Sequence, residues 1–239
     1  MKVRGHGLTP TRQARLAGAL YLAIIICGIG SEVLVRSSLI VPGDAAATAG
    51  NIRGAGMLFR AGFAADVIML FCDVALAVLL YRLFRPVSPT LSLMAAAFRL
   101  MQAAILGFNL LNYHAALLLL GGAGYAAAFE PAQLHALASF FLELHGHGYD
   151  LGLLFFGVSN LILGYLVIRS GYLPSLFGYA LQAAAVVYLV GSSTRFLVPE
   201  WLRLVQPAYV VPLLAELGFC QWLLTRGVRT KRCGERESS

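Results

Sequence analysis

The sequence predicts an all-α integral membrane protein, a polytopic bundle of six transmembrane helices with a short amphipathic helix at its outer surface. The first observation behind this prediction is the composition, because 59% of the 239 residues are hydrophobic and only 12% are charged, whereas a soluble domain carries about 25% charged residues. The second is a series of apolar runs, at residues 14–36, 56–81, 92–118, 151–168, 174–194 and 204–225. Each run is close to the roughly 20 residues with which a helix crosses a bilayer.

The first run has the character of an uncleaved membrane helix, since no small-residue cleavage site closes it. The loop after it contains Pro42-Gly43, which favours a turn, and Asp44, a good N-cap for the alanine-rich stretch that follows. We therefore expect a short helix there, near the outer surface. Residues 82–90 form a short hairpin containing two prolines, so the second and third spans should be antiparallel neighbours.

The long segment 121–150 begins with glycines and then shows apolar residues at a spacing of three to four. This periodicity predicts an amphipathic helix over about 131–144, lying in the membrane interface before the fourth span. In the sixth span, Pro207 and Pro212 are expected to kink the helix and to free backbone carbonyls.

Basic residues indicate the orientation. If the N-terminus is cytoplasmic, twelve of the 18 Lys and Arg residues fall on that side and only four on the other, as the positive-inside rule requires. We therefore expect a plasma-membrane protein with a cytoplasmic basic N-terminus at 1–13, a transmembrane domain at 14–226 and a cytoplasmic basic tail at 227–239. The net charge of +7 then indicates contact with the lipid bilayer and needs no nucleic acid.

Charged residues inside the spans are the best indication of function, because a charge at membrane depth is costly. Asp66 and Asp73 are seven residues apart, which places them on one face of the second helix. Arg99 of the third helix falls at about the depth of Asp73, so the two should form a buried ion pair, with Asp66 facing Gln102 or Asn109. Such pairs also serve simply as contacts between helices, and the sequence leaves both interpretations open.

Other polar residues at membrane depth are Glu32, Asn160, Gln182 and Glu216. The leading hypothesis is a cavity between the second, third and sixth spans that binds or transports a small molecule or lipid. Its expected ligand-binding residues are Asp66, Asp73, Arg99, Gln102, Asn109 and Glu216.

Histidines form a second group, expected on the outer side of the membrane. Imidazole and carboxylate groups can bind zinc or copper, so a metal site is conceivable at His114, His135, His145, His147 and Asp150. It requires the glycines around His145 and His147 to form a loop, because on a helix these two side chains point in different directions. This site would make the protein a membrane-embedded metal-dependent hydrolase, an alternative to binding; a third is a non-catalytic partner protein. No hydrolase elbow, phosphate loop or dinucleotide motif occurs.

Several short motifs resemble those of a known family. They are Val41-Pro42-Gly43-Asp44 continuing to Asn51-Ile52, Phe98-Arg99-Leu100, Phe155-Phe156-Gly157 with Gly164-Tyr165-Leu166, and Ser170-Gly171-Tyr172-Leu173-Pro174 leading to Gly178. Together, from about Arg12 to Pro199, the chain resembles the bacterial membrane family catalogued as domain of unknown function 4386 (DUF4386). This resemblance implies a multi-helix membrane protein, and it implies no reaction, ligand or catalytic residue at any position.

Overall fold

The computed structural model of the chain describes residues 9–122 and 124–228, and these form helices without strands. Six helical segments of the described chain are long and apolar enough to cross a membrane, which confirms the predicted fold class. The helices are α1 (Pro10–Gly30), α2 (Ser37–Leu39), α3 (Ala45–Gly54), α4 (Gly56–Phe84), α5 (Pro89–Leu120), α6 (Pro131–Ser170), α7 (Ser175–Leu197), α8 (Leu202–Val205) and α9 (Val210–Thr225). A π-helical turn, η1 (Ser31–Arg36), joins α1 to α2, and the 3-10 turns are η2 (Gly124–Ala128), η3 (Pro199–Trp201) and η4 (Gln206–Tyr209).

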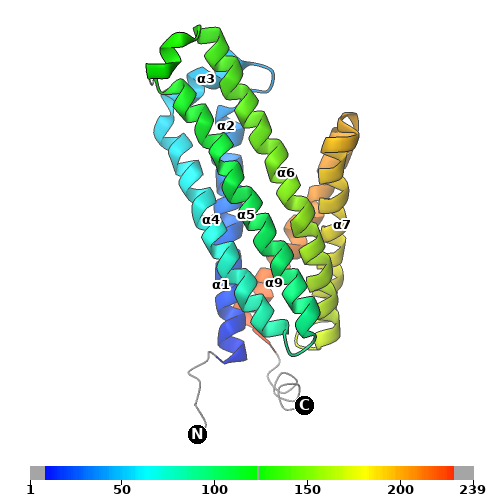
Figure 1. The fold of residues 1–239 in the computed structure, drawn as a ribbon. Helices are drawn as coiled ribbons and strands as arrows, with labels where there is room; N and C mark the ends of the chain where they lie inside the picture. The colour runs from blue at the N-terminus through cyan, green and yellow to red at the C-terminus, as the bar shows by residue number, and fades with distance from the viewer. Residues whose placement is uncertain (1–8, 123, 229–239) are drawn as a thin grey trace.

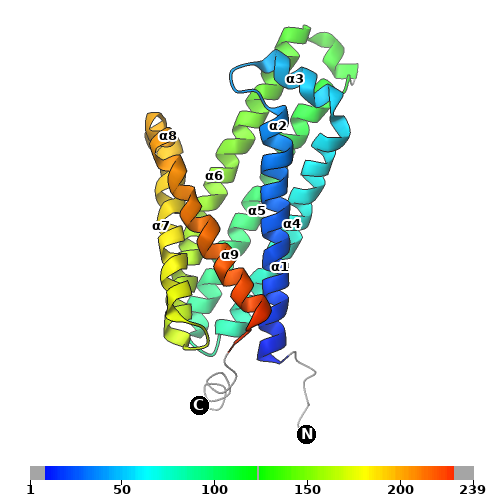
Figure 2. The ribbon, with the colours of Figure 1, turned by 180° about the vertical axis from the view of Figure 1, so that it is seen from behind.

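The six membrane-spanning elements form a closed ring. In order, α1 contacts α4, α4 contacts α5, α5 contacts α6, α6 contacts α7 and α7 contacts α9, which returns to α1. Figure 1 shows α4, α5 and α6 side by side with α7 on the far side of α6, and Figure 2 shows α9 crossing obliquely from α7 to α1. The start of α1 and the end of α9 lie at the same end of the bundle, which we call the terminal end.

Local sequence signals explain where several helices begin. Thr9, Asp44 and Ser88 each accept a hydrogen bond from a backbone N–H of the first turn that follows, in α1, α3 and α5. The helix predicted after Asp44 is therefore present as α3, at the end of the bundle opposite the termini. The short connection between α4 and α5 also makes these two helices neighbours, as the sequence predicts. The predicted basic termini, 1–13 and 227–239, lie mostly outside the described residues.

The prediction for residues 121–150 is partly wrong. Residues 131–144 are helical, but they run without interruption into the fourth span, so α6 is one helix of 40 residues rather than an interfacial helix and a separate span. The loop that a metal site at His145 and His147 would require is therefore absent from this described helix. The reason is packing: a Cβ on Gly148 would clash with Asn109 Oδ1, and one on Gly152 would lie 2.8 Å from Leu106 Cδ2. These glycines bring α6 close to α5, and this contact outweighs their weak helix propensity.

Two prolines account for the broken course of the sixth span. The segment Pro199–Thr225 is interrupted by the 3-10 turn that contains Pro207, and a regular helix resumes only at Val210, with Pro212 near its start. Proline lacks the N–H that continues an α-helix, so this kink agrees with the sequence.

Two apolar clusters hold the ring together, one towards each end. The cluster at the terminal end includes Tyr21, Leu76, Phe84 and Phe219. The cluster at the opposite end includes Ile52, Phe59, Tyr113 and Leu142 and contains residues of α3. Asp66 and Asp73 of α4 and Arg99 of α5 lie between these clusters along each helix, so they occupy the middle of the bundle.

The closest approach of α6 and α7 gives a test of the packing. A Cβ on Gly164 would lie 2.6 Å from the backbone oxygen of Gly178, and backbone cannot move aside as a flexible side chain can. We expect Gly164→Ala to lower the free energy of unfolding by about 1–3 kcal/mol. Thermal unfolding in detergent measures this, with Gly107→Ala as control, because its Cβ would meet Leu70 at an ordinary 3.7 Å. Equal stability of both variants would contradict the close contact.

Candidate functional site

The centre of the bundle contains a buried ion pair between α4 and α5. Arg99 Nε donates to Asp73 Oδ1 at 2.7 Å, and Arg99 Nη2 lies 2.5 Å from the same oxygen. Gln102, with its amide turned so that the nitrogen faces the carboxylate, donates to Asp73 Oδ2 at 2.7 Å. The side chains of Asp73 and Arg99 are 4% and 2% exposed, so both charges are removed from solvent. The predicted pair is therefore confirmed as a contact.

Aromatic rings surround the guanidinium of Arg99. Its Cζ lies 4.9 Å from the ring centre of Phe156 in α6 and 5.4 Å from that of Tyr21 in α1, distances at which a cation is attracted to a ring face. Arg99 Nη1 is buried and has no hydrogen-bond partner among the described residues. Arg99 thus connects four helices of the ring, yet one of its donor groups is unused.

Glu216 of α9 faces the same region. Its Oε1 accepts a hydrogen bond from the Tyr188 hydroxyl of α7 at 2.8 Å and from Asn160 Nδ2 of α6 at 3.3 Å. Within the described part of the chain, no Lys, Arg or His nitrogen lies within ion-pair distance of this carboxyl group. Glu216 is therefore held in place by neutral donors only.

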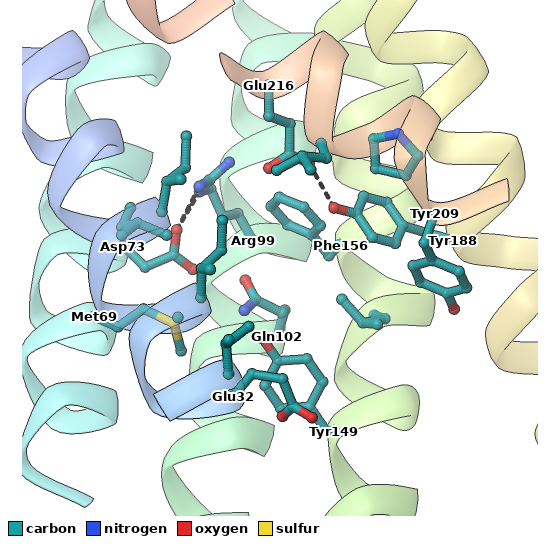
Figure 3. Close-up of a pocket in the computed structure, with 18 residues that line it drawn as sticks. Glu32, Met69, Asp73, Arg99, Gln102, Tyr149, Phe156, Tyr188, Tyr209 and Glu216 are labelled. Atoms are coloured by element: carbon teal, nitrogen blue, oxygen red, sulfur yellow. Dashed lines mark hydrogen bonds and ion pairs between the residues drawn. The ribbon is translucent and has the colours of Figure 1, made fainter. Parts of the chain in front are cut away.

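These groups line a cavity of about 290 Å³ that every helix of the ring helps to form. Figure 3 shows Asp73 and Arg99 on one side, Glu216 with Tyr188 on another, and Gln102, Tyr149 and Glu32 further along. The remaining lining is largely apolar and includes Ile24, Ile25, Ile29, Val33, Met69, Leu153, Phe156, Pro212 and Leu213. Cavities of this kind, apolar with a few placed polar groups, are typical binding sites.

Four of the six predicted ligand-binding residues line this cavity: Asp73, Arg99, Gln102 and Glu216. The expected contact of Asp66 with Gln102 or Asn109 is wrong. Asp66 accepts hydrogen bonds from Ser31 at 2.5 Å and from Arg36 at 2.7 Å instead. The π-helical turn that contains both donors brings them against α4. In the sequence analysis Arg36 counts as a residue of the outer side, outside the spans. Its spacing of four from Glu32 could have indicated an ion pair along one helix face, and Arg36 does donate to Glu32 at 2.7 Å.

Asn109 contributes to a contact between α5 and α6. Its Nδ2 donates to the backbone oxygen of His145 at 2.7 Å and lies 3.2 Å from Nδ1 of the same residue. The absence of a side chain at Gly148 leaves room for this amide. Asn109 therefore joins α5 to α6 and does not line the cavity beside Asp73 and Arg99.

The predicted metal ligands are not brought together. Asp150 pairs with Arg195 and accepts a hydrogen bond from Ser192 at 3.0 Å, both in α7. His147 Nδ1 is 2.9 Å from the backbone oxygen of Glu143, an interaction within α6. The other three histidines face different partners. His145 faces Asn109, His135 lies 3.2 Å from Arg53, and the His114 ring lies 5.6 Å from the Phe63 ring centre at a tilt of 49°. In the described ranges, no three His, Cys, Asp or Glu side chains lie close enough together to hold a metal ion. Because α6 is a continuous helix, it directs His145, His147 and Asp150 towards different neighbours.

Aromatic residues of the site were missed in the sequence analysis. Tyr149, Phe156, Tyr188 and Tyr209 line the cavity, but in a chain with 14 Phe and 10 Tyr residues nothing distinguishes them from lipid-facing rings. Tyr188, for example, looks like any other tyrosine of the spans in the sequence, and only the structure shows that its hydroxyl donates to Glu216. Only the position of each helix in the ring decides which rings face inwards.

The fold and the cavity define the class: a multi-pass α-helical membrane protein with a mainly apolar cavity between its helices that contains a few ionisable side chains. Sequence comparison then identifies the family. The profile described as "Domain of unknown function (DUF4386)" matches residues 16–227, so the chain belongs to that family. It is also similar to a protein of Archaeoglobus fulgidus described as "Uncharacterized protein", with 30% identity over 165 residues, 67% of this chain and 80% of the relative. This relative is archaeal, so the expected bacterial origin is not confirmed. No solved structure matches the chain.

The ion pair yields a test of its structural role. Asp73→Asn leaves the Arg99 guanidinium buried without a counter-ion, which should lower the free energy of unfolding by about 3–5 kcal/mol. The double variant Asp73→Asn/Arg99→Met removes both charges and should recover much of this loss. Thermal unfolding in detergent compares them with Asp44→Asn, an exposed cap that asparagine also serves. A double variant no more stable than Asp73→Asn would argue against the pair as the cause.

The scattered histidines lead to a second expectation. Elemental analysis of protein purified without a histidine tag should find zinc, copper and iron well below one atom per chain, because each of these imidazoles is directed at a different partner. One bound metal per chain that disappears in the His145→Ala/His147→Ala variant would contradict the observed arrangement.

Proposed function

We propose that this protein binds a small molecule or lipid in the cavity enclosed by its six spans, as a binding or transport protein of the plasma membrane. The observation that carries the proposal is the unfilled space of about 290 Å³ beside Asp73, Arg99 and Glu216. Ionisable groups at membrane depth are costly and typically mark ligand or ion pathways. A purely structural pair would not require an adjoining cavity.

The proposal includes an orientation with both termini in the cytoplasm. Six of the described arginines lie in the turns and helix ends at the terminal end: Arg12, Arg15, Arg82, Arg85, Arg169 and Arg226. Arg53, Arg195 and Arg203 belong to segments at the other end. This asymmetry supports a cytoplasmic terminal end.

A metal-dependent hydrolase is not part of the proposal, because the five residues considered for it are engaged with separate neighbours. Asp73 and Arg99 make the binding site rigid rather than reactive: their charges are paired and their positions are set by Gln102 and the surrounding rings. Glu216 is the carboxyl group left for a ligand.

Filling the cavity tests the proposal. Gly28 lines the cavity, and a Cβ there would first meet the flexible Met69 side chain, with its Sδ at 3.1 Å. Gly28→Leu should therefore fold and occupy the space that a ligand needs. Native mass spectrometry of protein purified in mild detergent should show a retained small molecule or lipid on the unaltered chain and its loss from Gly28→Leu.

The matched control is Gly30→Leu, two residues along the same segment, where a Cβ meets no described atom within 4 Å. It should retain the bound molecule. The proposal fails if the unaltered protein carries nothing, or if Gly28→Leu retains the same molecules as the control.

A further inference from the structure

The charges around the cavity do not balance. Four ionisable side chains line it: Glu32, Asp73, Arg99 and Glu216. Arg36 is shared between Glu32 and Asp66, and Arg99 pairs with Asp73, whereas Glu216 has no cation within 4 Å among the described residues. With every group in its usual ionised form, these four carboxylates and two arginines carry two excess negative charges, and Glu216 is the carboxylate among them that has no cation beside it. Burying a charge without a partner is strongly unfavourable, so the site favours a ligand that supplies a positive charge.

Aromatic rings surround the position that such a ligand would take. The hydroxyl of Tyr188 binds Glu216, and its ring makes edge contacts with Phe156 at 5.3 Å and with Tyr209 at 6.0 Å between ring centres. Figure 3 shows these rings beside Glu216 and around the open centre of the site. Cations, quaternary ammonium groups among them, bind to ring faces in such surroundings. Phe156 already accepts one cation, the guanidinium of Arg99.

The mouth of the cavity is mainly apolar, with Glu32, whose side chain is 61% exposed, as its charged member. Ile29 and Val33 of the first span and Leu213 of α9 line the cavity and are also 42%, 56% and 41% exposed. These residues lie within spans that are apolar enough to cross a membrane, so their exposed sides face lipid. The opening between the first span and α9 therefore leads sideways into the bilayer, and an apolar part of a ligand would be accommodated there.

We infer that the ligand of this cavity is a lipophilic monocation, an amine or quaternary ammonium group on an apolar body, which takes Glu216 as its counter-ion. The inference rests on the proposed function and specifies its ligand class. The cationic group lies between Glu216 and the rings of Phe156, Tyr188 and Tyr209. The apolar body contacts Ile29, Val33 and Leu213 and reaches the site from the membrane.

An anionic ligand fits these groups less well. Arg99 Nη1 lacks a hydrogen-bond acceptor, but the charge of Arg99 is already matched by Asp73 at 2.5 Å. An added anion would place a further negative charge beside Glu216, which has no cation partner among the described residues. A neutral ligand would fill the space and leave Glu216 without a counter-ion.

A series of three phenyl compounds that differ in charge tests the inference, and two of them also share one shape. The probes are phenyltrimethylammonium, its uncharged carbon isostere tert-butylbenzene, and benzoate. Binding is measured by equilibrium dialysis with the full chain in phosphatidylcholine nanodiscs, and empty nanodiscs give the partition into lipid, which is subtracted. We expect the cation to bind the unaltered protein more tightly than either other probe.

The variant Glu216→Gln keeps the shape and the hydrogen bonds of the side chain and removes its charge. We expect it to weaken binding of phenyltrimethylammonium by roughly ten- to a hundredfold, which corresponds to about 1.4–2.7 kcal/mol. Glu216→Asp should retain a preference for the cation, and Glu143→Gln, an exposed carboxyl group outside the cavity, should leave binding unchanged.

The outcomes separate the inference from the proposed function. Tighter binding of benzoate or of the neutral isostere, if it is lost in Gly28→Leu, would refute the inference that the ligand is a cation. It would still support the proposal that the cavity binds a ligand. Equal binding of the cation to the unaltered protein and to folded Glu216→Gln would also overturn it. If Glu216→Gln does not fold, the order of the three probes on the unaltered protein still decides. Absence of binding by all three probes overturns the inference, while the mass-spectrometric experiment decides the proposed function separately.

Discussion

The ion pair between Asp73 and Arg99 is the interaction on which the middle of this bundle depends. Each charge costs several kcal/mol to remove from water, and only a close, well-aligned partner offsets that cost. The pair therefore requires α4 and α5 to be adjacent and at matched depth. Gln102 completes the coordination of the carboxylate, and Phe156 and Tyr21 complete the surroundings of the guanidinium. Helices α1 and α6 are thus drawn to the same point.

Other polar contacts likewise join helices that are neighbours in the ring. Asp66 connects α4 to the turn after α1, Asn109 connects α5 to α6, and Asp150 connects α6 to α7. Glu216 brings α9 onto α6 and α7. In a bilayer the hydrophobic effect does not favour helix–helix contact over helix–lipid contact, so packing and hydrogen bonds select the neighbours. The glycines of α6 serve this selection by allowing α5 and α7 to approach.

The cavity results from the irregular elements of the ring. The π-helical turn after α1 directs Ser31 and Arg36 towards Asp66, and the 3-10 turn at Pro207 delays the start of α9 until Val210. The oblique course of α9 in Figure 2 places Glu216 against α6 and α7 near the centre. Irregular backbone in a membrane is tolerated where it is buried in protein or lines a cavity, and both turns contribute residues to this one.

The sequence alone determined the properties that depend on local composition and spacing. Apolar runs of spanning length predicted the six helices, Asp44 predicted the start of α3, and two short-range facts, the tight α4–α5 hairpin and the matched depth of Asp73 and Arg99, predicted the ion pair. Tertiary structure decided everything that depends on rotation of one helix against another. It joined residues 131–170 into one helix because close packing outweighs the helix-breaking tendency of glycine. It also paired Asp66 with Arg36 and placed the histidines against separate neighbours. Of the 24 Phe and Tyr residues, it placed Tyr149, Phe156, Tyr188 and Tyr209 in the lining of the cavity. Periodicity was of little help there, because lipid and core are equally apolar and a membrane helix carries no hydrophobic stripe that marks its inner face.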